Sequence, residues 1–174
     1  MSGQPQVRPD PALELLEVYD AALPHVHGYL LSRCRDRMLA QDLTAETFLA
    51  AVTAARQQPA PPITTGWLIG VARHKLADHW RRVDREQRGL SLVRTTGYEL
   101  DDPWDVEIDT VVAHQVLDAL GAHHRAALTL RYLDGLPVAQ VAEHLGRTVH
   151  ATEALLVRAR SAFRAAYEDP EGVR

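Results

Sequence analysis

The stretch LDGLPVAQVAEHLGRTVHATEALLVRARSAFRAAY, Leu133 to Tyr167, decides the fold of this chain. Its first half repeats apolar residues at helical spacing and stops at Gly146, a residue suited to a left-handed helix C-cap. A second helix is predicted after Arg147, because its apolar residues share one stripe. That stripe consists of Thr152, Leu155, Leu156, Ala159 and Phe163. An ordinary helical hairpin would show similar spacing, but the glycine turn and the basic residues opposite the stripe are typical of a helix-turn-helix and indicate duplex DNA as a partner.

Length and composition restrict the class of protein. The chain has 174 residues, enough for one or two small domains, and only 6% are aromatic. Abundant Ala, Leu, Arg and Glu favour helices. A single cysteine, Cys34, excludes an internal disulfide framework and is typical of a reducing cytosol. No apolar run is long enough to span a membrane, and the N-terminus resembles neither a signal peptide nor an anchor, so we expect a cytoplasmic protein.

Charge is distributed unevenly along a chain whose net charge is −4. From Arg73 to Arg94 there are seven Lys or Arg residues and three acids. From Glu99 to Asp109 there are six acids and no basic residue. The net charge argues against free, general affinity for DNA, and the basic stretch followed by an acidic one is an asymmetry that the function has to explain.

The periodicity predicts an all-α fold with two small helical domains joined by a flexible acidic linker. The expected domains are 12–87 and 110–167, with a disordered N-terminus at 1–11, the linker at 88–109 and a tail at 168–174. The expected helices are 12–36 with a bend at Pro24, 38–56, 67–86, 110–120, 123–133, 137–145 and 148–167.

Local signals set the helix boundaries and their apolar faces. Thr64 or Thr65 is a natural N-cap after the proline-rich loop QQPAPPITTG, and Pro137 suits the first residue of its helix. In the helix 38–56 the expected apolar face is Phe48, Val52 and Ala55, flanked by Leu43, Ala50 and Ala54. In the helix 67–86 it is Ile69, Ala72, Leu76, Trp80 and Val83.

Four motifs in this order resemble the extracytoplasmic-function sigma factors, over about Leu13 to Tyr167. AQDLTAETFLAA is similar to the family's Asp-Leu-x-x-Glu-x-Phe stretch, and WLIGVARHKLADHWRR to its Trp-Leu-x-x-x-Ala-Arg-x-x-x-x-Asp-x-x-Arg-Arg stretch. ALTLRYLDGLPVAQVAEHLGRT and LLVRARSAFR are similar to its helix-turn-helix. The resemblance implies sigma regions two and four, core RNA polymerase and promoter DNA as partners, and no enzymatic activity of its own.

In the first motif the resemblance implies a surface that binds the clamp helices of the polymerase's largest subunit. An acidic rim around an apolar patch also suits a basic partner helix on physical grounds. Asp42 and Glu46 are the expected contacts, more so than Phe48, which we expect to be partly in the core. The full set is Asp42, Leu43, Glu46, Thr47 and Phe48.

In the second motif the resemblance implies contact with the −10 promoter element and its melted strand. Arginines on this helix can bind phosphates, which would position the protein on DNA without recognising its sequence. Arginines that are only ordinary surface charge would show the same pattern. The loop Gln57–Thr65 is the expected rim of a pocket for an unstacked base. Trp67 and Trp80 are expected in the core. The −10 set is Arg73, His74, Lys75, Asp78, Arg81, Arg82 and Arg85, and the family often has Asn where this chain has His74.

In the helix-turn-helix the resemblance implies contact with the −35 element. Glu can accept from the cytosine amino group and Arg can bind guanine. The expected set is Arg147, Thr148, His150, Glu153, Arg158 and Arg160. The family commonly has Lys and Arg near the positions of Glu153 and Leu155, so weaker or different −35 contacts are expected here. The resemblance also implies that the linker acids enter basic polymerase channels, although a solvated linker would have the same composition.

Two other functions remain open from the residues. A helix-turn-helix regulator that binds DNA without polymerase would share the C-terminal motif, but it would not explain the acidic helix, and no dimerising heptad is visible. A metal-dependent hydrolase would need paired ligands, whereas His25-x-His27, His74 to His79 and His123-His124 lack a matching second motif. We therefore expect no catalytic site, no metal site and no cofactor. An anti-sigma factor is a possible partner by resemblance, and Cys34 has no resolving partner for redox sensing.

Overall fold

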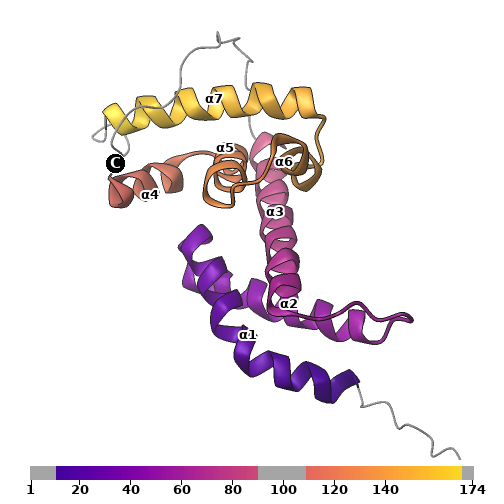
Figure 1. Cartoon of the computed structure of the whole chain (residues 1–174). Coiled ribbons are helices and arrows are strands. Elements are labelled where there is room, and N and C mark those ends of the chain that lie inside the picture. The colour runs from indigo at the N-terminus through magenta and orange to yellow at the C-terminus, as the bar shows by residue number, and fades with distance from the viewer. Residues whose placement is uncertain (1–10, 90–108, 170–174) are drawn as a thin grey trace, which may run out of the picture. The chain divides into compact units, whose positions relative to one another are not determined.

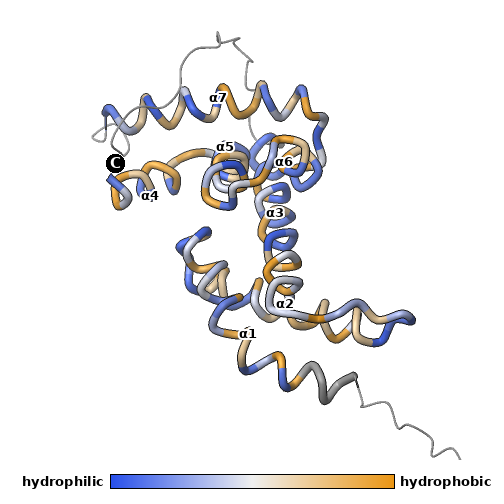
Figure 2. Tube along the Cα trace, viewed as in Figure 1, coloured by the Kyte–Doolittle hydropathy of each residue, from blue (hydrophilic) through white to orange (hydrophobic). Residues whose placement is uncertain are grey.

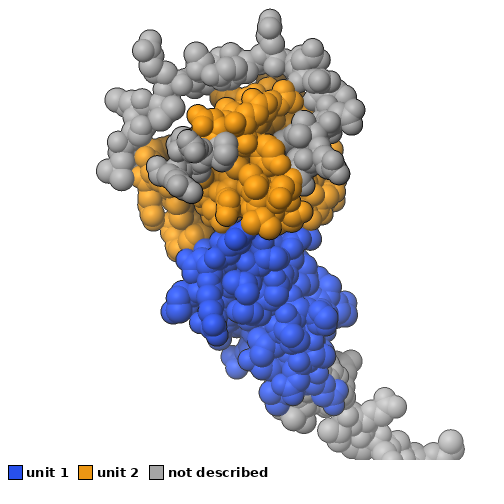
Figure 3. All heavy atoms as spheres, turned by 90° about the vertical axis from the view of Figure 1, so that its left-hand side faces the viewer, with its two compact units in different colours: residues 1–76 blue, residues 77–174 orange. Residues whose placement is uncertain are grey.

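The computed structural model describes residues 11–89 and 109–169. Every regular element in these two ranges is helical, which confirms the predicted all-α fold class (Figure 1). The chain divides into two compact units, residues 1–76 and residues 77–174 (Figure 3). None of the helices in the described ranges is long and apolar enough to cross a membrane.

The helices follow the predicted order. The first unit contains α1 (Pro11–Cys34), α2 (Arg37–Ala55) and the first part of α3 (Thr65–Gly89). The second unit contains the rest of α3, followed by α4 (Thr110–Ala119), α5 (Ala122–Leu128), the π-helical turn η1 (Thr129–Leu133), α6 (Val138–Leu145) and α7 (Val149–Glu168).

Several predicted boundaries differ from the structure. The compact units meet inside α3, whereas the helix predicted at 67–86 lay wholly within the predicted first domain, 12–87. The predicted N-terminal segment, linker and tail lie mostly outside the described residues. Where they are described, Pro11, Arg88, Gly89 and Glu168 are helical.

Side-chain caps explain where α2, α3 and α4 begin. Asp36 accepts hydrogen bonds from the N–H groups of Met38 and Leu39, at 2.9 and 3.1 Å, and so starts α2. Thr64 accepts from the N–H of Trp67 at 3.2 Å and starts α3, which selects Thr64 over Thr65 as the cap. Asp109 does the same for α4. Each cap satisfies N–H groups that have no partner inside the helix.

In the first unit, α1 packs on α2 through apolar residues one helical turn apart. The buried residues of α1 are Ala22, Val26, Leu30 and Cys34. The predicted apolar face of α2 is partly wrong, because Val52 and Ala50 are only half-buried, while Ala40 and Ala51 are fully buried. Thr44 and Thr47 also face the core, since their hydroxyls donate to the carbonyls of Ala40 and Leu43, at 2.6 and 2.7 Å.

The second unit is built around α7, which packs against α4, α5 and α6. All five residues of the predicted stripe, Thr152, Leu155, Leu156, Ala159 and Phe163, are buried, so this prediction is confirmed. Figure 2 shows polar and apolar residues alternating along α7, as an amphipathic helix requires. Arg125 of α5 donates to the carbonyls of Leu117 and Asp118 and thereby satisfies the end of α4.

Two helix predictions in this unit need correction. The helix expected at 123–133 ends as an α-helix at Leu128 and widens into η1, where the N–H of Asp134 donates to the carbonyl of Thr129 at 3.0 Å. Such a widened turn leaves no periodicity signal in so short a segment. Pro137 is the N-cap of α6, with extended backbone, and the helix begins one residue later than predicted.

Candidate nucleic-acid interface

The turn between α6 and α7 is closed by backbone hydrogen bonds. Gly146 has a left-handed backbone, with φ of 61°. Its N–H donates to the carbonyl of Glu143 at 3.1 Å, and the N–H of Arg147 donates to the carbonyl of Ala142 at 2.9 Å. These bonds form a Schellman motif, which ends α6 and directs the chain into α7. Both helices of the predicted helix-turn-helix are therefore present, with Gly146 as its turn.

The start of α7 separates the predicted −35 residues into two groups. Thr148 uses its hydroxyl to cap α7, accepting from the N–H of Ala151 at 3.2 Å. His150 and Glu153 are exposed, with His150 Nδ1 3.9 Å from Glu153 Oε2. The imidazole of His150 is 97% exposed, so the first turn of α7 presents polar groups to solvent. A recognition helix reads base edges from this end.

The three predicted −35 arginines are less accessible than His150 and Glu153. Arg147, Arg158 and Arg160 are all half-buried. Burial lowers the pKa values of His123 and His124 of α5, and the charge of Arg158 adds a smaller effect in the same direction. The guanidinium of Arg147 approaches a carboxylate of α3, Asp84, at 3.7 Å. Only part of the predicted set therefore forms an open polar surface.

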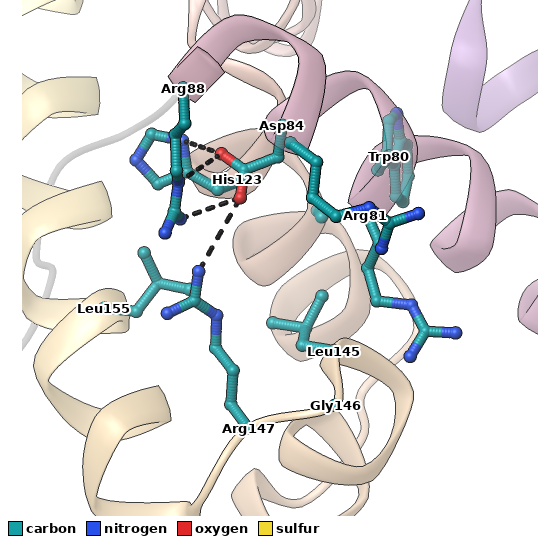
Figure 4. A pocket seen from close by; sticks show the side chains of 11 residues that line it. Trp80, Arg81, Asp84, Arg88, His123, Leu145, Gly146, Arg147 and Leu155 are labelled. Atoms are coloured by element: carbon teal, nitrogen blue, oxygen red, sulfur yellow. Dashed lines mark hydrogen bonds and ion pairs between the residues drawn. The ribbon is translucent and has the colours of Figure 1, made fainter. Parts of the chain in front are cut away.

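Asp84 is the centre of a cluster of polar side chains from three parts of the second unit (Figure 4). Its side chain is 12% exposed. Arg88 Nη2 lies 2.7 Å from Oδ2, and Arg88 Nε donates to Oδ1 at 3.1 Å. His123 Nδ1 lies 3.1 Å from Oδ1 but makes no hydrogen bond there, so this contact is a close polar approach. Arg147 completes the cluster, hereafter called the Asp84 cluster.

A cavity of about 280 Å³ adjoins the Asp84 cluster. Besides Asp84, Arg88, His123 and Arg147, its lining includes Arg81, Trp80, Leu145, Gly146 and Leu155. A Cβ atom placed on Gly146 would lie 3.0 Å from Nη1 of Arg81, which shows how closely α3 approaches the turn of the helix-turn-helix. This part of the second unit is therefore lined by cations from α3 and from the turn.

Burial keeps the paired histidines of α5 neutral. It lowers the pKa of His123, and the carboxylate of Asp84 only partly opposes this effect, while Arg88, Arg147 and Arg158 reinforce it. It lowers the pKa of His124 to about 4, with smaller contributions from His123 and Arg158. The two rings lie 4.1 Å apart between centroids. Both imidazoles are therefore uncharged at neutral pH and do not act as cationic contacts to DNA.

Sequence reasoning missed the Asp84 cluster. Asp84 was counted only as one of three acids in a basic stretch, and His123-His124 only as a possible metal motif. The spacing of Asp84 and Arg88 on one helix was the single local signal. The contacts with His123 and Arg147 join residues far apart in the sequence, and no periodicity reports them.

The predicted −10 residues of α3 lie in two environments. In the first unit, Lys75 forms an ion pair with Glu46 of α2 at 3.5 Å, and His74 is exposed. In the second unit, Arg81 pairs with Asp78, and Arg82 lies 3.2 Å from Nδ1 of His79. Arg85 is exposed and Arg73 is half-buried. Trp80 is buried, as expected for a core residue, and Trp67 is half-buried.

The predicted polymerase-binding residues of α2 also divide by burial. Asp42 and Glu46 are exposed, whereas Leu43, Thr47 and Phe48 are buried in the first unit. The buried three belong to the packing of α2, and of this set only Asp42 and Glu46 face solvent. Phe48 packs against Tyr19 of α1, with 4.6 Å between ring centroids.

Two exposed apolar residues complete the outer surface of α2. Met38 is 67% exposed and Leu49 is 66% exposed, although both are large apolar side chains. At helical spacing, Met38, Asp42 and Leu49 share a face, with Glu46 beside them, and we call these four residues the α2 face. Sequence reasoning assigned the apolar part of this surface to Leu43 and Phe48. The α2 face has the same chemistry, but Met38 and Leu49 supply its apolar part.

The histidine groups and Cys34, which the sequence raised as candidates for other chemistry, can be located within the described residues. Within residues 11–89 and 109–169, no three His, Cys, Asp or Glu side chains lie close enough together to hold a metal ion. Cys34 is buried at the end of α1, where its thiol lies 3.3 Å from the carbonyl oxygen of Asp36.

Two family models match the chain, in order along its length. The model of Sigma-70 region 2 matches residues 18–86. The model of Sigma-70, region 4 matches residues 111–163. The first match includes the α2 face and most of α3, and the second includes the helix-turn-helix.

Named relatives extend this match. The chain is 32% identical over 152 residues to the ECF RNA polymerase sigma factor BldN of Streptomyces coelicolor, covering 82% of this chain and 56% of BldN. It therefore spans little more than half the length of that relative. It is 34% identical over 130 residues to the probable RNA polymerase sigma-C factor of Mycobacterium bovis, covering 71% of this chain and 68% of that protein. It is 28% identical over 154 residues to the ECF RNA polymerase sigma factor SigM of Bacillus subtilis, covering 87% and 93%.

A solved structure shares the fold. The sigma factor RpoE of Bartonella quintana, crystallised with the anti-sigma factor NepR, superposes with a TM-score of 0.53 at 19% identity, covering 90% of this chain and 98% of that one. With the motif order, the family models and the relatives in agreement, the chain belongs to the extracytoplasmic-function (ECF) family of RNA polymerase sigma factors.

Proposed function

We propose that the chain is an alternative sigma factor that binds core RNA polymerase in the cytoplasm and directs it to a two-part promoter. It carries no enzymatic activity of its own. The observation that carries this proposal is the combination of the α2 face with a helix-turn-helix whose first turn presents polar side chains. A regulator that binds DNA alone needs the second surface but not the first.

The α2 face is the proposed contact with core polymerase. Met38 and Leu49 offer apolar area that is otherwise costly to leave in water, and Asp42 and Glu46 add negative charge beside it. A partner helix with apolar and basic residues would satisfy both groups. This assignment replaces the buried Leu43, Thr47 and Phe48 as direct contacts.

The helix-turn-helix is the proposed contact with the −35 element. Glu153 can accept from a cytosine amino group, and Arg147 and Arg160 can reach guanine or phosphate in the major groove. His150 stands at the open end of α7 and lies near Glu153. Thr148 contributes by fixing the start of α7, because its hydroxyl is already used as the cap.

The basic residues of α3 are the proposed contact with the −10 element. Lys75, Arg82 and Arg85 would meet phosphates, and the preceding loop Gln57–Thr65 would border a pocket for an unstacked base. Capture of that base would open the duplex by binding energy, without ATP.

An anti-sigma factor is a fitting regulatory partner. The structural relative RpoE was crystallised with such a protein. For this chain we propose that a partner of that kind would cover the α2 face, because exposed Met38 and Leu49 provide apolar area that polymerase would also use. Such a partner would compete with core polymerase.

Run-off transcription tests the proposed function. Purified core RNA polymerase of the source organism would transcribe fragmented genomic DNA with and without this protein. Discrete start sites that need both components would support the sigma function, and their aligned upstream sequences would reveal the two elements. No transcripts, together with specific DNA binding by the protein alone, would favour a polymerase-independent helix-turn-helix regulator.

A further inference from the structure

The outward face of α7 includes apolar side chains that the proposed −35 contacts leave out. The buried stripe of α7 faces the core of the second unit, so residues about half a turn away from it face outward. Near the start of the helix these residues are His150, Glu153, Ala154 and Val157. Their spacing of i, i+3, i+4 and i+7 places them on one side of α7, which we call the reading face.

Two neighbouring residues of the reading face are apolar. Ala154 and Val157 lie one helical turn apart, and Ala154 is exposed while Val157 is half-buried, so part of its side chain is accessible. The hydrophobic core takes its residues from the opposite side of α7, around Leu155 and Ala159. Packing of the second unit therefore does not require an apolar side chain at either position of this pair.

The nearest arginines of α7 lie beside the reading face and not on it. Arg158 and Arg160 are half-buried and lie roughly a quarter-turn from its middle, in opposite directions around the helix. A helix in the major groove has a phosphate backbone on each side, so arginines in these positions are placed to bind phosphates. Phosphate contacts position the helix but do not distinguish bases. The choice of bases therefore depends on the side chains between the two arginines.

The major groove offers one apolar group to such side chains. The 5-methyl group of thymine is apolar, whereas the other groups that base pairs present there are hydrogen-bond donors and acceptors. An apolar pair on the reading face therefore favours thymine, because beside any other base it would desolvate a polar group without bonding to it. The short side chain of Ala154 also allows the backbone of α7 to come close to the bases. Glu153, next to this pair, can accept from a cytosine amino group.

We propose that Ala154 and Val157 determine the specificity for the −35 element by contacting thymine 5-methyl groups, beside a cytosine that Glu153 recognises. The inference rests on the proposed function, because it uses α7 as the −35 contact. Glu153 and Val157 are about one helical turn or 5.4 Å apart, and base pairs rise about 3.4 Å, so the thymine lies within about two base pairs of the cytosine.

The test removes single methyl groups from the promoter. Deoxyuridine differs from thymidine only in lacking the 5-methyl group, so it keeps every hydrogen bond of the base pair. In a fluorescein-labelled promoter mapped by run-off transcription, each thymine of the −35 element is replaced in turn. The affinity of the complex between core polymerase and the full-length protein is measured by anisotropy. At one or two positions this affinity should fall about 4-fold, the effect of one buried methyl-sized group.

Variants of the protein connect this loss to the reading face. Val157→Thr keeps the β-branched shape but replaces a methyl group by a hydroxyl, so deoxyuridine at the sensitive position should then change affinity less than about 1.5-fold. Val111→Thr makes the same substitution at a valine near the start of α4 that is 64% exposed, and it should keep the full loss. Ala154→Ser alters an exposed residue and replaces Val157→Thr if that variant fails to fold.

Two results would overturn the inference. One is a wild-type affinity that no deoxyuridine in the −35 element changes. The other is a loss that persists unchanged in Val157→Thr and in Ala154→Ser, which would assign the methyl contact to another part of the protein. Failure of the sigma function would appear as an absence of polymerase-dependent transcripts from the unsubstituted DNA. Failure of the methyl contact alone would leave those transcripts intact.

Discussion

The α2 face and the Asp84 cluster place acidic side chains in opposite environments. Asp42 and Glu46 stand in solvent beside the exposed apolar residues Met38 and Leu49. Asp84 is buried, and Arg88 and Arg147 already neutralise it. The comparison shows that burial, more than the charge pattern of the sequence, determines whether a carboxylate is available to a binding partner. An exposed acid is available to a partner, whereas a buried acid is already committed to the fold.

The largest expected effect is on the α2 face. Leu49→Glu should lower the affinity for core polymerase about 30-fold, corresponding to about 2 kcal/mol, because it places a charge where apolar contact is proposed. Native gel shift or surface plasmon resonance with core polymerase measures this loss. Leu16→Glu makes the same substitution at another exposed leucine, 62% exposed on α1, and should bind normally. Equal losses in both variants would remove Leu49 from the proposed surface.

The next effect concerns the ion pair of Asp84 with Arg88. A double-mutant cycle with Asp84→Asn and Arg88→Gln should give a coupling of about 1.5 kcal/mol in urea unfolding, because the pair is short, charge-assisted and screened little on the carboxylate side. A coupling below about 0.5 kcal/mol would mean that the buried carboxylate behaves like a surface acid. That result would contradict the distinction between Asp84 and the exposed acids of the α2 face.

The pH dependence of stability should reflect the buried imidazoles of α5. The pKa of each imidazole is lower in the folded chain than in the unfolded chain, and that of His124 is lowered to about 4. Folding therefore favours the neutral form of both side chains. Stability is therefore complete above about pH 6.5 and is lost as the pH falls from about 6.5 towards 4. The charged neighbours Asp84, Arg88, Arg147 and Arg158 are included in these shifts.

Urea unfolding at pH 7.5 and pH 5 measures this loss, which should be about 1 kcal/mol after discounting for partial exposure of the ring. His124→Gln should reduce the difference between the two pH values. His150→Gln removes a 97% exposed imidazole and should leave the difference unchanged. The same difference in wild type and His124→Gln would contradict the prediction.

The smallest expected effect is on the pair of Glu46 with Lys75. The side chains are 52% and 34% exposed and the atoms lie 3.5 Å apart. A double-mutant cycle with Glu46→Gln and Lys75→Met should give a coupling of about 0.5 kcal/mol or less, since solvent screens an exposed pair. A coupling as large as that of Asp84 with Arg88 would show that the exposure of a carboxylate does not determine the strength of its ion pair.

Prediction from sequence worked where the signal was local. The stripe of α7, the turn at Gly146 and the cap at Thr64 depend on residues a few positions apart, and each is present in the structure. The prediction was weaker for α2, because threonines that bond back to the helix can replace apolar residues in the core. It failed for η1, where the helix widens without a change of pattern.

The candidate site follows the same rule. Asp42, Glu46, His150 and Glu153 were predicted as contacts from motifs whose residues lie within one or two helical turns, and all four are exposed. Met38 and Leu49 were missed, since an apolar residue in a helix is ordinarily assigned to the core. Asp84 was missed as well, because nothing near it in the sequence distinguishes a buried acid from a surface one.

The sequence by itself determined the all-α class, the order of the helices and the helix-turn-helix. These features arise from periodicity, capping and glycine conformation, which act within a few residues. Only the tertiary structure decided which charges are paired and which apolar side chains remain in solvent. Asp84 meets His123 and Arg147 because packing brings distant segments together, and burial then makes those contacts strong.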